Sequence, residues 1–580
     1  MIMKVSDYIT NFLIERGVQK CFSVTGGFAM HLNDSFGEKF DVTYTHGEQP
    51  AGYAALGWSA YEHDPSICCV TSGCGATNAI TPCLIAYQDS VPVFFISGQV
   101  QSKDNIRSRG GRDRGYFGSD CNIIESVKGI TKYAVELIDP KDTHHILEKC
   151  YENLTTGRLG PIWLSIPIDV QSMEVPTTSP ARARRYTHWT HSLAPPLDDL
   201  PCDFLELWSK SERPIVLAGN GIHLSKTKRE FRDFLNRHKL PYVVSYFGSD
   251  LGHEYTGKVG ILGNRSGNFA IQNADLILCL GCRLSKSITG YNRQLFAREA
   301  KIVYIDIDKS EFMDEKKVDV KVYMDLKTFF GIELPKSNIQ NVWIDRNKEW
   351  KRLWDKELPP KNGDRVCPYR HLQKFFDEKK GDSIVTMSSG SIVCVGWHMY
   401  TPKDSDRLII SSHGDMGFEV PASIGASFHG KRTYVIVGDG SFQFNVQELQ
   451  TLKHHNLPVT VMVFNNNGYE AIKISQAAVF KRQFGTSPDS GISFCDVEKI
   501  AKAYDLKYHK IERDDDVSYL DHTDGPVIVE IFCNSQGRFP RVANKPMPDG
   551  SFQNMPHEEM SPFLDDKTLK QHLFVRRVSS

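Results

Sequence analysis

Two segments near the C-terminal end decide the fold: Thr433-Tyr-Val-Ile-Val-Gly-Asp-Gly-Ser-Phe442 and Val459-Thr-Val-Met-Val-Phe-Asn-Asn-Asn-Gly-Tyr469. Each begins with a short apolar run typical of a buried strand, and the stretch 445–456 between them has helical spacing. Together they predict one strand–helix–strand unit with parallel strands. Because the carboxyl ends of parallel strands meet at one edge of a sheet, Asp439 and Asn466 are expected to face one ligand.

The residue types at this edge indicate a phosphate and metal site. Gly438 and Gly440 allow close approach of the backbone, and a helix N-terminus follows them. The carboxylate of Asp439, the amide oxygen of Asn466 and the backbone carbonyl of Gly468 are hard oxygen donors that suit Mg²⁺, and Mg²⁺ suits a diphosphate. Gly-Asp-Gly alone is equally a common turn at a strand end. The paired asparagines that follow the next strand favour the functional interpretation.

The same alternation of apolar strands and helical stretches runs through the rest of the chain. It predicts an α/β protein with three doubly wound parallel-sheet domains. Two stretches rich in proline and without periodicity, 176–201 and 335–368, interrupt the pattern and are predicted to be linkers, the second with a helix near Trp343 to Trp354. The predicted units are the domains 1–180, 195–335 and 365–535, and a tail 536–580 with little regular pattern.

Composition excludes several classes of partner. The 580 residues include 69 basic and 70 acidic side chains, which leave a formal charge of -1 and no global attraction for nucleic acid or an anionic membrane. No apolar run reaches the length of a membrane span, and the N-terminus does not have the pattern of a signal peptide. Fourteen scattered cysteines indicate reduced thiols, so a cytoplasmic location is expected.

A second group of polar residues lies near the N-terminus. Glu48 stands where a predicted strand passes into a helix of small residues, within Tyr44-Thr-His-Gly-Glu-Gln-Pro-Ala-Gly-Tyr-Ala-Ala-Leu-Gly57. A glycine- and hydroxyl-rich loop, Thr71-Ser-Gly-Cys-Gly-Ala-Thr-Asn78, follows the next strand. From the residues alone, Glu48 is as well explained as a carboxylate that stabilises a helix N-terminus as by a catalytic role.

Taken together, these segments resemble the thiamine-diphosphate enzymes of the acetolactate synthase group. The resemblance covers nearly the whole chain in order, and its main motifs are Thr25-Gly-Gly27, His46-Gly-Glu-Gln49, Thr71-Ser-Gly73, Gln88-Asp-Ser-Val-Pro92, Gly414-Asp-Met-Gly417 and the run from Asp439 to Gly468. It implies a pyrimidine-binding, a central Rossmann-like and a diphosphate-binding domain. It also implies a homodimer or homotetramer, because one cofactor would touch Glu48 of one subunit and Asp439 of another.

The resemblance implies a role for each site residue. Glu48 would be the catalytic group, bonded to N1′ of the aminopyrimidine. The backbone carbonyl of Gly414 would accept from the 4′-amino group, and Met416 would be the apolar wedge that bends the cofactor. Asp439, Asn466 and the carbonyl of Gly468 would hold Mg²⁺ on the diphosphate. The other residues expected to contact thiamine diphosphate are Thr25, Gly26, Gly438, Gly440, Ser441 and Tyr469.

The implied reaction is decarboxylation of a pyruvate-like 2-keto acid, followed by transfer of the acyl unit to a second carbonyl. Two alternatives remain open: a simple 2-keto-acid decarboxylase, and a catalytically inactive scaffold subunit. The central domain leaves two further alternatives. Its loops Ala218-Gly-Asn-Gly221 and Gly281-Cys-Arg-Leu-Ser285 are compatible with a structural FAD, as in acetolactate synthases, and with an empty domain.

The acceptor side departs from acetolactate synthases. Ser119 stands where they usually have glutamine, and the stretch 470–476 lacks their usual pattern. The chain is most similar to the subset that builds branched or modified sugars, on the evidence of residues 24–34, 465–476 and the tail. The expected acceptor is therefore a keto-sugar nucleotide, with Arg538 and Arg541 as candidate phosphate ligands. Taken singly, each of these arginines is explained slightly better as a partner in a surface ion pair.

Overall fold

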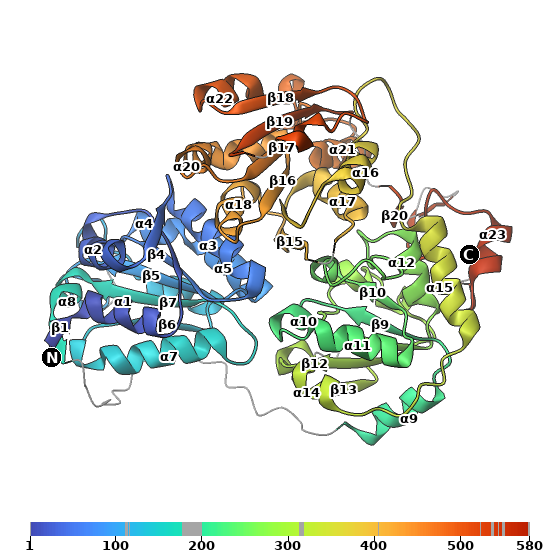
Figure 1. The fold of residues 1–580 in the computed structure, drawn as a ribbon, viewed down its shortest axis with the longest axis horizontal. Helices are drawn as coiled ribbons and strands as arrows, with labels where there is room; N and C mark the ends of the chain where they lie inside the picture. The colour runs from blue at the N-terminus through green and yellow to red at the C-terminus, as the bar shows by residue number, and fades with distance from the viewer. Residues whose placement is uncertain are drawn as a thin grey trace.

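The computed structural model describes residues 2–110, 114, 116–176, 200–312, 318–403, 405–522, 524–534, 537, 539–542, 545–547 and 552–577. Three α/β domains lie around a common junction, as Figure 1 shows. Each domain contains one sheet of parallel strands with helices on both faces, so the predicted fold class is confirmed. Most of the first predicted linker lies outside the described residues.

The N-terminal domain contains a six-stranded sheet in the order β3-β2-β4-β5-β7-β6. Its strands are β2 (Lys20–Ser23), β3 (Asp41–Tyr44), β4 (Ser66–Val70), β5 (Val93–Gln99), β6 (Tyr133–Glu136) and β7 (Ile162–Pro167). The main helices are α1 (Val5–Glu15), α2 (Met30–Lys39), α3 (Glu48–Glu62), α4 (Cys74–Asn78), α5 (Ile80–Asp89) and α7 (Thr143–Thr155). The central strands are continuous apolar runs because both faces of the sheet are covered.

The central domain contains a five-stranded sheet in the order β10-β9-β11-β12-β13. The strands are β9 (Pro214–Ala218), β10 (Tyr242–Val244), β11 (Leu276–Leu280), β12 (Lys301–Asp306) and β13 (Val320–Tyr323). Its helices include α9 (Cys202–Lys210), α10 (Gly221–Leu224), α11 (Lys228–His238), α12 (Arg265–Asn273), α13 (Lys286–Thr289) and α14 (Leu326–Gly331). The second predicted linker contains α15 (Asn341–Trp354), as expected, and Trp343 and Trp350 bury their rings in this domain.

The C-terminal domain contains a six-stranded sheet in the order β15-β14-β16-β17-β19-β18. The strands are β14 (Ser383–Met387), β15 (Arg407–Ile410), β16 (Arg432–Gly438), β17 (Val459–Asn465), β18 (Lys507–Ile511) and β19 (Val527–Phe532). The helices are α16 (Pro368–Glu378), α17 (Gly390–Met399), α18 (Glu419–Ser427), α19 (Asp439–Phe442), α20 (Leu449–His454), α21 (Glu470–Phe480) and α22 (Val497–Ala503). β16 and β17 pair in parallel, as their sequences predict.

Two local predictions differ from the structure. The helix expected over 445–456 is shorter, because Asn445 has a non-helical φ of -136° and donates its amide to the carbonyl of Gly417. The tail is more regular than its sequence indicates. It contains α23 (Asp566–His572), and β20 (Arg541–Val542) pairs with β23 (Met560–Ser561). Leu569 packs into the core of the central domain, so the tail belongs to that domain's surface.

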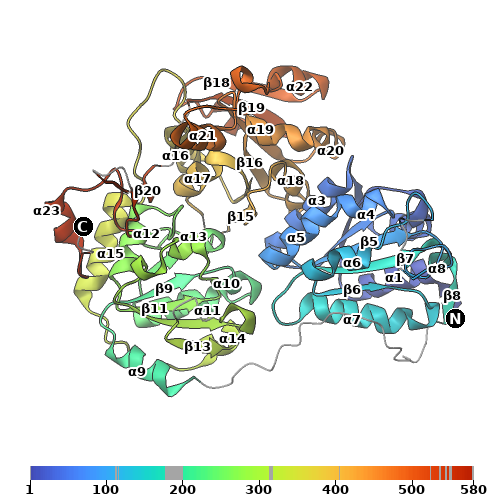
Figure 2. The ribbon, with the colours of Figure 1, turned by 180° about the vertical axis from the view of Figure 1, so that it is seen from behind.

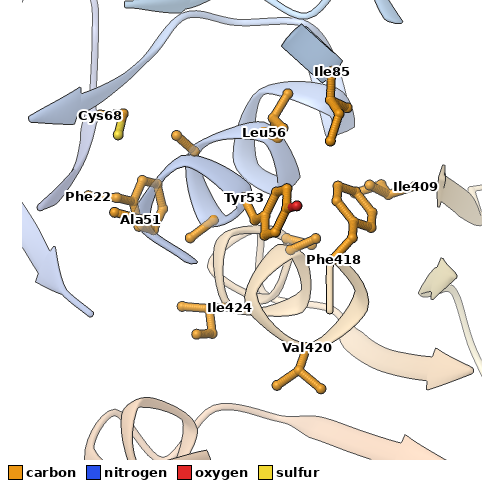
Figure 3. Close-up of a cluster of buried hydrophobic side chains, with 14 of the residues drawn as sticks. Phe22, Ala51, Tyr53, Leu56, Cys68, Ile85, Ile409, Phe418, Val420 and Ile424 are labelled. Carbon is orange, nitrogen blue, oxygen red and sulfur yellow. The ribbon is translucent and has the colours of Figure 1, made fainter. Parts of the chain in front are cut away.

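The N- and C-terminal domains share one hydrophobic core. Helices α3 and α18 cross so closely that a Cβ on Gly57 would lie 2.0 Å from the carbonyl oxygen of Ala422. Figure 3 shows Tyr53 and Phe418 facing each other across this crossing, and their ring centroids are 5.4 Å apart. The rear view in Figure 2 shows the same two domains in contact along these helices. Among the described helices, none has the length and apolarity to cross a membrane.

Candidate cofactor-binding site

At the carboxyl ends of β16 and β17, where open α/β sheets have their binding crevice, polar groups gather around Asp439. Its Oδ1 accepts from the backbone amide of Gly440 at 2.9 Å, and its Oδ2 accepts from that of Gly468 at 3.1 Å. The side chain is only 4% exposed, and burial raises the pKa of Asp439 to about 6 against the opposing effect of these amides. A buried carboxylate of this kind favours a cation beside it.

Asn466 supplies a second oxygen donor to the same crevice. Its Oδ1 is buried and has no hydrogen-bond partner among the described residues. Buried polar atoms are nearly always satisfied, so an orphaned amide oxygen beside a desolvated carboxylate indicates a missing ligand. Carboxylate, amide and carbonyl oxygens are the donors that Mg²⁺ prefers. The residues present therefore fit a magnesium ion.

The loop that carries Asn466 is stabilised by a hydrogen bond to Glu530, a residue that the sequence patterns did not reveal. Glu530 of β19 accepts from Asn465 Nδ2 and from the hydroxyl of Tyr508, both at 2.6 Å. Asn465 Oδ1 in turn accepts from the amide of Asn467, whose φ is +57°. The sequence contains one indication of this role: Glu530 lies inside the apolar run 527–532, and a carboxylate buried in such a strand needs a hydrogen-bond partner.

Two glycines of the crevice are required by close packing. A Cβ on Gly440 would lie 2.2 Å from Cε1 of Tyr469, and one on Gly468 would lie 2.8 Å from the carbonyl oxygen of Thr486. Tyr469 therefore lies directly over the Asp-Gly turn. A Cβ on Gly438 would meet only Ile392 Cγ2, at 4.0 Å, which is an ordinary contact, so packing does not explain that glycine.

The loop after β15 lies against the crevice and carries Gly414 and Met416. Gly414 has a φ of +67°, a left-handed conformation that favours glycine, and Met416 is half-buried. The amide of Gly417 donates to Ser441 Oγ at 2.8 Å, which joins this loop to the turn after Asp439. The structure thus brings the predicted wedge residue and the predicted diphosphate residues together.

Glu48 lies in a separate group on the N-terminal domain. It is the first residue of α3, it is half-buried, and its Oε2 accepts from Asn78 Nδ2 at 3.0 Å. A Cβ on Gly26 would meet the Thr71 side chain at 2.4 Å, so the Thr25-Gly26 loop packs on the loop at 71–78. Asn78 is the last residue of the loop 71–78 described from the sequence, and its contact with Glu48 was not predicted.

Within one chain these two groups lie at opposite ends of the α3–α18 pair. A Cβ on Gly425 would touch the carbonyl of Ala54, and one on Gly57 would touch that of Ala422, so the helices run antiparallel. Glu419, at the start of α18, is therefore level with about residue 60 of α3. At roughly 1.5 Å per residue, Glu48 lies some 18 Å further along. Glu419 contacts Ser441, so this estimate places Glu48 about 18 Å from the level of Ser441. Near Glu48, the backbone amide of His46 donates to Glu448 of the C-terminal domain.

A cavity of 430 Å³ lies where the three domains meet. It is lined by Arg158 of the N-terminal domain, by Arg283 and Asp306 of the central domain, and by Ser412 and Gly414 of the loop after β15. Its size lies within the roughly 300–1,000 Å³ typical of cofactor sites. It extends from the sheet of the central domain to the predicted wedge loop.

Known proteins match this chain over all three domains. Residues 3–125 match the thiamine pyrophosphate enzyme N-terminal TPP binding domain, residues 203–331 the central domain, and residues 388–531 the C-terminal TPP binding domain. The acetolactate synthase large subunit of Lactococcus lactis is 28% identical over 91% of this chain and 92% of its own length. A probable acetolactate synthase 2 of Oryza sativa is 30% identical over 80% of this chain and 71% of its own length. The chain therefore belongs to the thiamine pyrophosphate enzymes, in the family of the acetolactate synthases.

Proposed function

We propose that this enzyme uses Mg²⁺ and thiamine diphosphate to decarboxylate a pyruvate-like 2-keto acid and to transfer the acyl unit to a second carbonyl. The observation that carries this proposal is the crevice in which a desolvated carboxylate, Asp439, lies near the orphaned Oδ1 of Asn466. Calorimetry with thiamine diphosphate, with and without Mg²⁺, tests it. Binding that is independent of the metal would contradict it.

Each residue of the site has a task in this proposal. Asp439, Asn466 and the carbonyl of Gly468 hold the metal, while Gly440 and Ser441 approach the diphosphate. Glu48 would hold and return a proton at N1′ of the aminopyrimidine, the Gly414 carbonyl would orient its amino group, and Met416 would pack against the cofactor. When bound, the cofactor accepts the electrons released as CO₂ leaves.

We propose that the active unit is a homodimer, or a homotetramer built from such dimers. Within one chain, about 18 Å of α3 separates Glu48 from the level of the crevice, by helix rise. A second copy can bring its own Glu48 to the crevice of the first, so two chains would complete two sites. Exposed apolar side chains on α21 and after it, Ile472, Val479, Phe480 and Phe484, support a partner surface there.

We propose a keto-sugar nucleotide as the acceptor. Ser119 lies on the pyrimidine side, because a Cβ on Gly73 would touch its carbonyl at 2.8 Å. The tail reaches the opposite side: the Cβ position of Gly537 lies 3.6 Å from Ile474 Cδ1 on α21. Arg541 follows in β20, whereas Arg538 lies outside the described residues. We propose that Arg541 meets a phosphate of this acceptor.

Product analysis separates the candidate reactions. With pyruvate and candidate keto-sugar nucleotides, a branched sugar product is expected. Rapid acetolactate formation from pyruvate alone, unaffected by sugar nucleotides, would make the second keto acid the acceptor. Free aldehyde with CO₂ would instead identify a simple decarboxylase. No turnover despite cofactor binding would favour the inactive scaffold.

We propose that FAD occupies the cavity between the three domains in a structural role. Support comes from its volume and from glycine-mediated packing of its loops, since a Cβ on Gly219 would lie 2.3 Å from the Gly281 carbonyl oxygen. The visible absorption spectrum of the purified protein tests this, and a spectrum without flavin bands would favour the empty domain.

We also propose a cytoplasmic location, supported by fourteen free cysteines.

A further inference from the structure

A fully buried carboxylate, Glu419, lies beneath the crevice and has no role in the proposed function. It is the first residue of α18 and has no solvent exposure. α18 follows the loop after β15, while the two helix N-termini that it faces follow β14 and β16. In this sheet β14 lies between β15 and β16, so the chain reverses its winding direction at this point. Ligands of open α/β sheets bind in such a crevice.

Glu419 joins the two helix N-termini through their serine residues. Its Oε1 accepts from the backbone amide of Ser389 at 3.1 Å and from the Ser389 hydroxyl at 3.2 Å. Its Oε2 accepts from the Ser441 hydroxyl at 2.8 Å. Ser389 is the residue before α17, and Ser441 lies in the turn that begins at Asp439. One carboxylate therefore holds the serine side chains at the start of both helices.

The same bonds reach the loop that carries Gly414 and Met416. Ser441 Oγ accepts from the amide of Gly417 while it donates to Glu419. The hydroxyl of Thr386 on β14 donates to the backbone carbonyl of Glu419 at 3.0 Å, which fixes the start of α18. Glu419 is thus the shared acceptor of a buried network, and such networks hold their members in one geometry.

We propose that Glu419 is a positioning residue that holds the side chains of Ser389 and Ser441 at the edge of the sheet where the diphosphate of the cofactor binds. This inference rests on the proposed function, because it requires the diphosphate to lie in the Asp439 crevice. Burial raises the pKa of Glu419 to about 7, so a substantial fraction of the carboxyl groups is protonated near neutral pH, and the protonated form tolerates an anion nearby. When the carboxyl is neutral, its proton can be donated to a serine oxygen, and the serine hydroxyl is then available to a phosphate oxygen.

The test compares the affinity of wild type, Glu419→Ala and Glu419→Gln for thiamine diphosphate in the presence of Mg²⁺. Loss of the acceptor releases two hydroxyl groups, and each misplaced hydrogen bond costs about a factor of ten, so Glu419→Ala is expected to bind roughly 10- to 100-fold more weakly. Glu419→Gln is expected to bind within about threefold of wild type, because an amide can accept from Ser389 and donate to Ser441.

A double-mutant cycle separates positioning from a general loss of stability. Ser441→Ala should weaken binding in the wild-type background and should have little additional effect in the Glu419→Ala background. Asp406→Asn is the matched control. Asp406 is a buried carboxylate of the same sheet, paired with Lys379 at 2.7 Å and bonded to the amide of Ser383 at the other end of β14. This variant should lower the melting temperature and leave the cofactor affinity unchanged.

Three results would overturn the inference: wild-type affinity in Glu419→Ala, fully additive effects of Glu419→Ala and Ser441→Ala, or a loss in Glu419→Gln as large as about 100-fold. If Glu419→Ala does not fold, the affinity of Glu419→Gln relative to wild type still tests the inference. Failure of the proposed function looks different. In that case wild type itself does not bind the cofactor, or Asp439→Ala binds it as tightly as wild type.

Discussion

The carboxylate of Asp89 accepts a hydrogen bond from the backbone amide of Ser412 at 3.0 Å, and this bond crosses from the N-terminal to the C-terminal domain. Ser412 lies two residues before Gly414, so the N-terminal domain holds the loop that is expected to contact the aminopyrimidine. Asp89 is 6% exposed, and its second oxygen is buried without a hydrogen-bond partner among the described residues.

A pH-dependent stability difference between wild type and Asp89→Asn follows. Burial raises the pKa of Asp89 to about 6, so its contribution to stability is complete below about pH 3.8 and is lost as the pH rises through 6. Asparagine keeps the acceptor for Ser412 and cannot ionise. Relative to wild type, the free energy of unfolding of the variant should increase by on the order of 2–3 kcal/mol as the pH rises from about 4 to 7. Urea unfolding at several pH values measures this, and a pH-independent difference would contradict it.

We expect Asp439→Ala to abolish cofactor retention. The substitution removes the charged metal ligand and leaves the diphosphate uncompensated in the crevice. Since the loss of an outer-shell partner of a metal costs about 10- to 100-fold, removal of a direct ligand should weaken binding by more than about 100-fold. Calorimetry with Mg²⁺ and thiamine diphosphate measures it. Normal affinity would show that the metal lies elsewhere.

Glu48→Gln should keep the fold and the cofactor and lose most activity. The amide occupies the same space and can remain beside Asn78, but it cannot exchange a proton with N1′. Loss of general acid–base catalysis typically costs about 10²- to 10⁴-fold. Deuterium exchange at C2 of the bound cofactor reports the step directly, and near-wild-type exchange would exclude the assigned role.

Mixing the two inactive variants should restore activity if sites are shared between chains. A dimer of one Glu48→Gln and one Asp439→Ala chain has one intact site and one doubly altered site. With random exchange of subunits, half of the dimers are mixed, so about a quarter of wild-type activity is expected. Continued inactivity, despite exchange shown by differently tagged chains, would mean that each site belongs to one chain.

Gly57→Ala should weaken the contact between the N- and C-terminal domains. The added carbon would lie 2.0 Å from a backbone oxygen of α18, so the helices must move apart. Overpacking of this kind typically costs about 1–3 kcal/mol. Thermal unfolding measures the loss. Gly129→Ala, which places its Cβ in open space, is the control and should unfold like wild type.

The sequence by itself determined the fold class and which polar residues lie at the carboxyl edge of the C-terminal sheet. Strands β16 and β17 and their parallel pairing were predictable, because short apolar runs bounded by glycine and separated by a helical stretch are typical of parallel strands. The residues at their carboxyl ends, Asp439 and Asn466, were predictable for the same reason. Adjacent parallel strands necessarily bring their following loops together, and residue type then limits the chemistry.

Tertiary structure alone revealed the supporting residues. Glu419 and Glu530 carry no motif, and their partners lie 22 or more positions away along the chain. The late start of α20 and the regular tail also depended on distant contacts, such as Asn445 with Gly417 and Leu569 with the central core. Local sequence indicates secondary structure through residue propensity and hydrophobic period. The hydrogen-bond partners of a buried polar group, in contrast, depend on which distant residues the tertiary fold brings next to it. The antiparallel crossing of α3 and α18, which separates Glu48 from the crevice of its own chain, likewise exists only when both domains are packed.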